Sequence, residues 1–169
     1  MGVPNRKPPS AAASGDFETR ATELHHESLR LWLRMLTCSS LIETQVRQRL
    51  QSQFNTTLPR FDLMAQLERS PDGLKMGELS RRMMVTGGNV TGITDMLEKE
   101  GLVARGADVL DRRALRVKLT RDGKRQFARM AREHERWVTD LFSGLDARAK
   151  SQLGNLLGEL KRHIARRHN

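Results

Sequence analysis

Residues 79–103 read LSRRMMVTGGNVTGITDMLEKEGLV, and this stretch decides the fold. Within it, Val90, Ile93 and Leu97 recur at intervals of three and four residues. This is the period of an amphipathic helix that buries one face. A shorter apolar pattern precedes it, so the stretch predicts a short helix, a tight turn and a second helix.

The second helix carries an unusual number of glycines in its first half, namely Gly87, Gly88 and Gly92. Each glycine inside a helix costs about 1 kcal/mol relative to alanine, so something should offset that cost. Thr86 is a candidate N-cap before the glycines, and Gly101 is a candidate C′ residue after the helix. The alternative is that a loop carries the first two glycines and that the helix begins only after them.

The neighbouring segments complete the order of a known motif. A short helix begins near Pro59 and ends in the turn SPDG at residues 70–73. Beyond the glycine-bearing helix, Leu115, Val117 and Leu119 alternate with basic residues, which predicts one strand of a small hairpin. Helix, helix, turn, helix and basic hairpin follow one another in a winged helix-turn-helix. The predicted fold class is mainly α with a small β-hairpin wing, in which a winged helix-turn-helix core is flanked by dimerisation helices.

Long tracts without proline on both sides of this core predict long helices. Their apolar faces are broader than the core needs, so a partner should cover them. The expected organisation is a flexible basic tail, an N-terminal dimerisation helix, the DNA-binding core and C-terminal helices that complete the dimerisation region. These parts are expected at residues 1–16, 17–57, 58–120 and 121–169, in that order.

The composition indicates an anionic partner and an intracellular location. A formal net charge of +10 and a pI near 10.9 favour nucleic acid as the partner. The single cysteine, Cys38, excludes an intramolecular disulfide and fits a reducing compartment. No run approaches the ~18 apolar residues of a membrane-spanning helix. We therefore expect a cytoplasmic protein that does not bind membranes.

The sequence lacks the motifs of an enzyme or a metal site. It has no nucleophile elbow, and no lysine stands where it would make the glycines a phosphate-binding loop. His25, His26 and Glu27 adjoin one another, but without the spacing of a metal-binding motif. We expect no catalytic residue, no metal and no cofactor.

The glycines acquire a role if their helix enters the major groove of DNA. A recognition helix reads bases with residues near its N-terminus, where small or polar side chains let the backbone approach the duplex. The N–H groups of the same turn suit a phosphate. The candidate DNA contacts on this helix are Thr86, Gly87, Gly88, Asn89, Thr91, Gly92 and Thr94.

Together these motifs resemble the DNA-binding core of the MarR family of transcription regulators. The run at residues 79–103 resembles the family's helix-turn-helix, and DRRALRVKLTRDG at residues 111–123 resembles its wing strand and the start of the next helix. The resemblance implies that Arg113 of the wing enters the minor groove, oriented by Asp111. The other wing candidates, as phosphate contacts or solvated charges, are Arg105, Arg112 and Arg116.

The resemblance also implies a homodimer whose outer helices interlock, so that two recognition helices meet a palindromic operator in double-stranded DNA. It further implies a small-molecule effector, bound between these helices and the core, that weakens DNA binding. The expected function is a ligand-responsive repressor, and its ligand is expected to be an aromatic carboxylate or an acyl-CoA thioester. The candidate pocket residues are Trp32, Arg34, Met35, Ser39, Arg60, Met64, His134 and Trp137.

Two alternatives to this function stay open. A non-specific architectural DNA-binding protein would also explain the positive charge. A redox-responsive regulator could sense through Cys38, although the position of this residue on an apolar helix face favours a buried, unreactive thiol.

Overall fold

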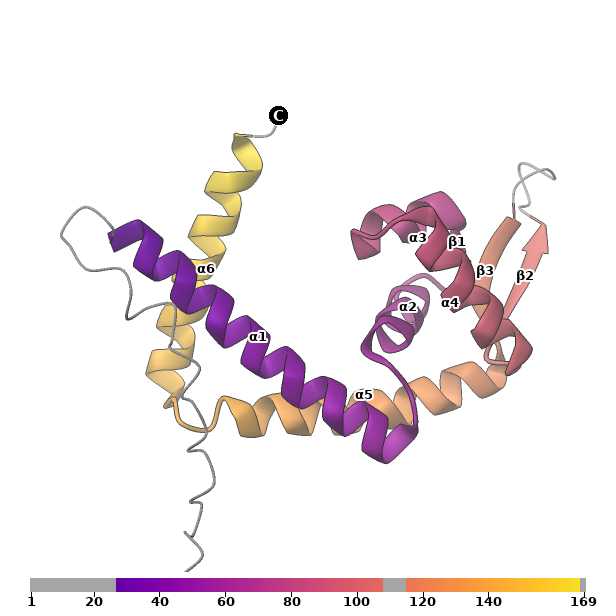
Figure 1. Cartoon of the computed structure of the whole chain (residues 1–169), viewed down its shortest axis with the longest axis horizontal. Coiled ribbons are helices and arrows are strands. Elements are labelled where there is room, and N and C mark those ends of the chain that lie inside the picture. Colours follow the sequence, from indigo (N-terminus) through magenta and orange to yellow (C-terminus); the bar gives the residue numbers. More distant parts are fainter. Residues whose placement is uncertain (1–26, 108–114, 168–169) are drawn as a thin grey trace, which may run out of the picture. The chain divides into compact units, whose positions relative to one another are not determined.

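The computed structural model describes residues 27–107 and 115–167, in six helices and three strands (Figure 1). The helices are α1 (Glu27–Phe54), α2 (Leu58–Glu68), α3 (Met76–Met83), α4 (Gly87–Lys99), α5 (Arg121–Leu141) and α6 (Ala147–Arg166). The strands are β1 (Leu74–Lys75), β2 (Val103–Ala107) and β3 (Leu115–Leu119). The predicted class, mainly α with a small β wing, is confirmed.

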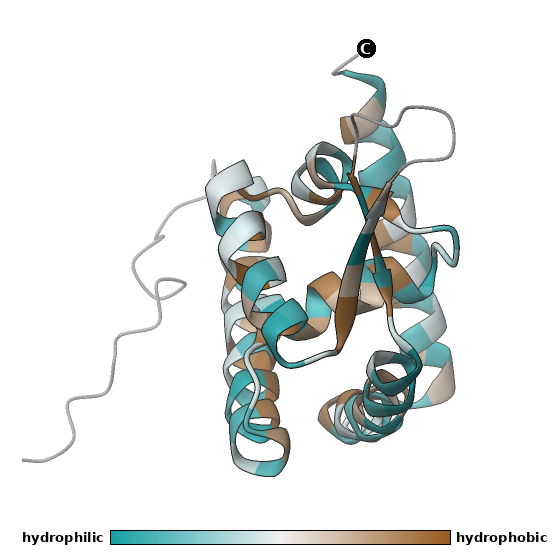
Figure 2. Ribbon diagram, turned by 90° about the vertical axis from the view of Figure 1, so that its right-hand side faces the viewer, coloured by the Kyte–Doolittle hydropathy of each residue, from teal (hydrophilic) through white to brown (hydrophobic). Residues whose placement is uncertain are grey.

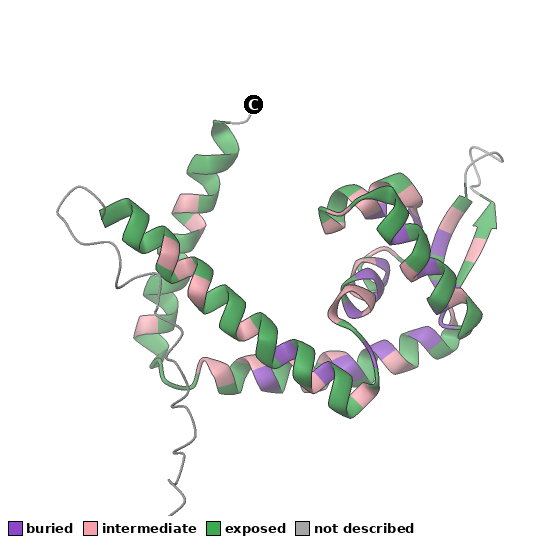
Figure 3. Ribbon diagram, viewed as in Figure 1, coloured by how far each residue is buried: buried purple, intermediate pink, exposed green. Residues whose placement is uncertain are grey.

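Contacts divide the described residues into two units, between Glu43 and Thr44 inside α1. The large exposed hydrophobic residues of the first unit, which is the N-terminal part of α1, are Leu29, Leu31, Trp32, Leu36 and Leu41. In the second unit, the C-terminal part of α1 packs on α5, where the rings of Phe54 and Trp137 lie 6.1 Å apart. α6 also belongs to the second unit and contains no buried residue (Figure 3).

α2 lies at the centre of the second unit. It packs against α5, which passes below it in Figure 1, and against α3, α4 and β3. Its buried residues are Phe61, Leu63, Met64 and Leu67. Phe61 packs against Phe127 of α5, with ring centroids 5.4 Å apart. Hydrophobic residues of the elements around α2 gather on their inner sides (Figure 2), so one core holds α4, β3 and α5 together.

The sheet has the strand order β1-β3-β2, and both pairings are antiparallel. β2 and β3 form the predicted hairpin, with Val103 opposite Leu119 and Arg105 opposite Val117. β1 was not predicted; its Leu74 pairs opposite Val117. Two residues cannot show a strand period, so only the long-range pairing defines β1.

α4 has the ends that the sequence predicts. It begins at Gly87 with Thr86 as N-cap, so a start after the first two glycines is excluded. Val90 and Leu97 are buried against the core. Gly101 follows the helix with a φ of 70°, the left-handed conformation that favours glycine at C′.

The base of the wing is in close contact with the start of α5. A Cβ on Gly123 would lie 1.9 Å from the carbonyl oxygen of Leu102, so only glycine fits at this position. The hydroxyl of Thr120 caps α5 by accepting a hydrogen bond from the N–H of Gly123 at 3.0 Å, and it donates to the carbonyl of Gly101 at 2.7 Å. These contacts tie the end of α4, the start of β2 and α5 together.

Candidate DNA-binding surface

The N-terminal half of α4 exposes backbone that no side chain within residues 27–107 and 115–167 covers. Gly87, Gly88 and Gly92 are exposed, and a Cβ on any of them would meet nothing within 4 Å. The packing of the described residues therefore does not require these glycines. They lower the helix propensity of α4 without improving an internal contact, which indicates a contact outside the chain.

The first turn of α4 also leaves its N–H groups available. Thr86 occupies the N-cap position with a φ of −67° and a ψ of 151°, but its side chain forms no capping hydrogen bond. The first N–H groups of a helix have no acceptor within the helix, and the helix dipole places partial positive charge there. This end of α4 can therefore donate hydrogen bonds to a phosphate.

The two threonines inside α4 use their hydroxyls within the helix. Thr91 donates to the carbonyl of Gly87 at 3.0 Å, and Thr94 donates to the carbonyl of Val90 at 2.7 Å. Thr94 is fully buried, so its prediction as a DNA contact is wrong. The sequence spacing indicates this burial, because Thr94 follows Val90 by four residues and precedes Leu97 by three, which places it on the buried face of the helix.

Arg105 of β2 is bound to α4. Its guanidinium donates to the carboxylates of Asp95 and Glu98, and its backbone N–H donates to Glu98 Oε1 at 3.1 Å. Burial lowers the pKa of Arg105, but these two acceptors outweigh it and raise the pKa. The expected phosphate contact or solvated charge is thus a clamp that neutralises two carboxylates of α4 and holds β2 against this helix.

Of the four remaining wing candidates, one supports the fold and three lie outside the described residues. Arg116 donates from Nη1 to the carbonyl of Gly73 at 2.8 Å, and so it supports the turn before β1. Asp111, Arg112 and Arg113 lie outside the described residues. Their role at the DNA stays a prediction.

The residues predicted for an effector pocket have different surroundings. Four of them, Trp32, Arg34, Met35 and Ser39, belong to the N-terminal part of α1. In the second unit, Met64 and Trp137 are buried in the core, and the guanidinium of Arg60 pairs with Glu100. These three side chains therefore serve packing and the fold. The eighth residue, His134, lines a cavity.

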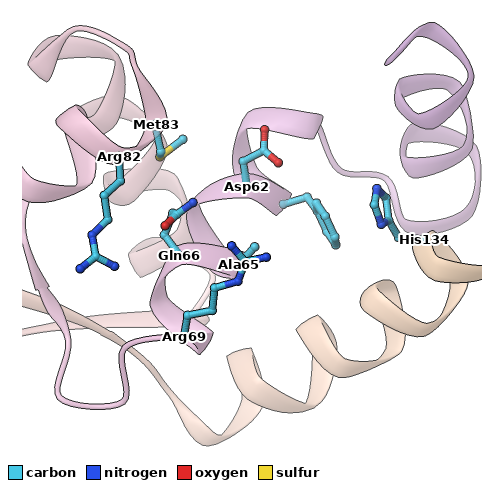
Figure 4. Close-up of a pocket in the computed structure, with 8 residues that line it drawn as sticks. Asp62, Ala65, Gln66, Arg69, Arg82, Met83 and His134 are labelled. Atoms are coloured by element: carbon cyan, nitrogen blue, oxygen red, sulfur yellow. The ribbon is translucent and has the colours of Figure 1, made fainter. Parts of the chain in front are cut away.

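This cavity has a volume of about 360 Å³ and lies beside α2, α3 and α5 (Figure 4). Its lining residues are Phe61, Asp62, Ala65, Gln66, Arg69, Arg82, Met83 and His134. The rings of His134 and Phe61 lie 4.8 Å apart, and burial lowers the pKa of His134. Arg82 donates to Ser70 Oγ at 3.1 Å and to Glu78 Oε1 at 2.6 Å. Rings and guanidinium groups together suit a small molecule with an aromatic and an anionic part.

Sequence reasoning missed most of the residues in this cavity. One feature of the sequence could have identified three of them: Asp62, Gln66 and Arg69 recur at helical spacing on the polar side of α2, opposite its buried face. Of the lining residues, His134 alone was predicted from the sequence; nothing in the sequence placed Arg82 beside α2, because it comes from another helix.

Three further expectations concern the burial of the Cys38 thiol, the absence of a metal site and the absence of a membrane-spanning helix. Cys38 is exposed, which corrects the expectation of a buried thiol. The described part of the chain has no group of three or more His, Cys, Asp or Glu that could hold a metal ion, and His25 and His26 lie outside it. None of the helices within residues 27–107 and 115–167 is long and apolar enough to cross a bilayer.

Known proteins share this architecture. The model of the MarR family matches residues 56–115. The HTH-type transcriptional regulator PecS of Dickeya dadantii is 26% identical over 127 residues, which are 74% of this chain and 76% of PecS. The uncharacterized HTH-type transcriptional regulator YkoM of Bacillus subtilis is 30% identical over 119 residues, which are 70% of this chain and 75% of YkoM.

Solved structures give the same result. A MarR family transcriptional regulator from Silicibacter pomeroyi has a TM-score of 0.72 at 29% identity, over 85% of this chain and 99% of its own. Sco3205, a MarR family transcriptional regulator from Streptomyces coelicolor solved in complex with DNA, has a TM-score of 0.72 at 26% identity, over 85% of this chain and 88% of its own. These relatives are transcriptional regulators rather than enzymes. The chain therefore belongs to the MarR family of DNA-binding transcriptional regulators.

Proposed function

We propose that this protein is a ligand-responsive repressor that binds a palindromic operator as a homodimer. The observation that carries the proposal is the start of α4, where exposed glycines adjoin N–H groups that Thr86 does not cap. Packing within the described chain does not require the glycines, whereas close approach to a duplex does. The DNA complex of Sco3205 supports the docking of this fold on DNA.

Exposed apolar side chains support the homodimer. Leu153, Leu156, Leu157 and Ile164 of α6 are 39%, 64%, 40% and 49% exposed, at the spacing of one helix face. A contiguous apolar face of this kind marks an interaction site, and a two-fold pair of identical chains matches a palindrome. Sedimentation equilibrium should give a dimer, and a monomer at concentrations that bind the operator would contradict the proposal.

Footprinting on the DNA upstream of the protein's own gene tests sequence specificity. The expected result is a protected palindrome whose half-sites lie about 10 bp apart. Uniform protection without a preferred site, with a steep dependence on salt, would support the non-specific architectural protein instead.

The wing is tested with Arg113→Ala. If Arg113 enters the minor groove, its loss should lower the affinity for the operator and leave the dimer intact. Arg148→Ala is the matched control, because it removes the same charge from an exposed position on α6. Equal binding by Arg113→Ala and the parent protein would remove this arginine from the mechanism.

We assign the ligand to the cavity beside α2, which shares His134 with the set predicted from the sequence. Its volume of about 360 Å³ is at the lower end of the range for small-molecule sites. Phe61 and His134 contribute rings to its lining, and Arg69 offers positive charge for a carboxylate, whereas Arg82 is paired with Glu78. The size favours an aromatic carboxylate over an acyl-CoA thioester, because the nucleotide of the thioester would have to remain outside.

Titration calorimetry with benzoate tests this assignment. Arg69→Gln should abolish the binding heat, whereas Arg129→Gln, on the exposed side of α5, should not. Binding of benzoate by Arg69→Gln at parental affinity would exclude the cavity as the site.

The response to the ligand and the sign of regulation need two further assays. Benzoate should weaken operator binding in a mobility-shift assay. Transcription from a promoter that overlaps the operator should fall when the protein is added. Increased transcription would show an activator.

A further inference from the structure

We propose that Asn89 is the side chain of α4 that reads sequence in the major groove, and that it reads an adenine. The inference rests on the proposed function in one respect, because α4 must enter the groove. It follows from the hydrogen bonds that occupy the other polar side chains of this helix.

The threonine hydroxyls of α4 donate inside the helix. Thr94 is buried and bonded to the carbonyl of Val90, so it cannot reach a base. The donor of Thr91 is taken by the carbonyl of Gly87, which leaves its oxygen as an acceptor only. Thr86 precedes the helix and has one short hydroxyl, which suits a phosphate contact better than a paired contact with a base edge.

The charged side chains of α4 are also accounted for. Asp95 and Glu98 both accept hydrogen bonds from the guanidinium of Arg105, which holds these carboxylates toward β2 and neutralises their charge. Lys99 is the last residue of α4 and lies ten residues beyond Asn89, which is roughly 15 Å along the helix axis. It is therefore far from the end that a recognition helix inserts.

Asn89 is exposed in the first turn of α4, and its amide has no partner within the described residues. Gly92 and Met96 follow it on the same face of the helix, three and seven residues later, and Gly88 precedes it. Because neither glycine carries a Cβ, the edges of the bases can approach the amide closely. Met96 is 49% exposed and can contact a thymine methyl further along the groove.

The chemistry of the amide selects the base. An asparagine offers one donor and one acceptor side by side, and adenine presents the complementary N6 donor and N7 acceptor in the major groove. Guanine presents two acceptors there, and cytosine presents a donor alone. A bidentate pair with adenine is therefore the arrangement that satisfies both groups of Asn89.

Selection from a pool of randomised duplexes tests the proposal on the full chain. The parent protein should select one fixed A·T pair in each half-site, and Asn89→Ala should lose the preference at that position alone. Asn155→Ala is the matched control, because it makes the same change on an exposed face of α6 and should select as the parent does.

Atom-level evidence comes from the selected duplex with 7-deazaadenine at the fixed position, which removes the N7 acceptor. This change should weaken binding of the parent by on the order of 10- to 100-fold and binding of Asn89→Ala by less than about twofold. A preferred sequence that Asn89→Ala selects equally well, or a fixed G·C pair that depends on Asn89, would overturn this proposal and leave the proposed function standing. A pool without any preferred sequence would overturn both.

Discussion

Gly92→Ala should make the protein more stable and, at the same time, a weaker DNA binder. Gly92 lies inside α4, where alanine is favoured over glycine by about 1 kcal/mol. A Cβ at this position would meet nothing within 4 Å, so the substitution removes a cost without creating a clash. We expect the free energy of unfolding to rise by about 1 kcal/mol, which is about fivefold in the folding equilibrium constant.

The same methyl group would stand between α4 and the floor of the major groove. If close approach carries binding, the operator dissociation constant should increase by about tenfold, which corresponds to about 1.4 kcal/mol. Denaturant unfolding and fluorescence anisotropy with a labelled operator measure the two effects on one preparation. The bulkier Gly88→Leu should abolish operator binding.

Gly154→Ala is the matched control for Gly92→Ala. Gly154 is an exposed glycine inside α6, and its Cβ would also meet nothing within 4 Å. This variant should gain similar stability and keep the operator affinity of the parent. A Gly92→Ala protein that is stabilised and still binds the operator as tightly as the parent would refute the role given to the exposed glycines.

Four further predictions use denaturant unfolding. Gly123→Ala should lower the free energy of unfolding by about 3 kcal/mol, because the new Cβ would overlap the carbonyl of Leu102, and a stable variant would contradict that contact. Met84→Gly should raise the free energy of unfolding by about 1 kcal/mol, because Met84 has a φ of 54°, which favours glycine, and its side chain is 93% exposed. No gain in stability would show that the backbone at Met84 is unstrained. Arg105→Gln should lower the free energy of unfolding by about 1 kcal/mol. It should also weaken operator binding, because the carboxylates of Asp95 and Glu98 would then lack their cation and repel the phosphates. Unchanged operator binding would show that this clamp has no part in DNA recognition. Burial lowers the pKa of His134 below its usual value of 6.5, so on acidification the unfolded chain binds this proton at a higher pH than the folded protein does, and the free energy of unfolding falls as the pH drops below 6.5. His134→Gln should flatten this pH dependence. An unchanged pH profile would assign the dependence to other groups.

The surface proposed for DNA was partly readable from the sequence because some of its signals are local. The glycines, the N-cap Thr86 and the turn before them are defined by a few neighbouring residues, and the structure places them at the exposed start of α4. Thr94 was misassigned because its polar side chain was given more weight than its helical spacing. Arg105 was misread for another reason: its acceptors, Asp95 and Glu98, meet it only after the chain turns back at the end of α4.

The sequence by itself determined the order of helices and wing strands, the ends of α4 and the resemblance to the MarR family, because helical period, capping residues and strand alternation are properties of short segments. Only the tertiary structure decided that Leu74 forms a strand, that Gly123 packs on the backbone of Leu102, and which side chains line the cavity beside α2. Each of these features joins residues that are distant in sequence. Their contacts depend on how the helices pack around α2, and no local pattern contains that information.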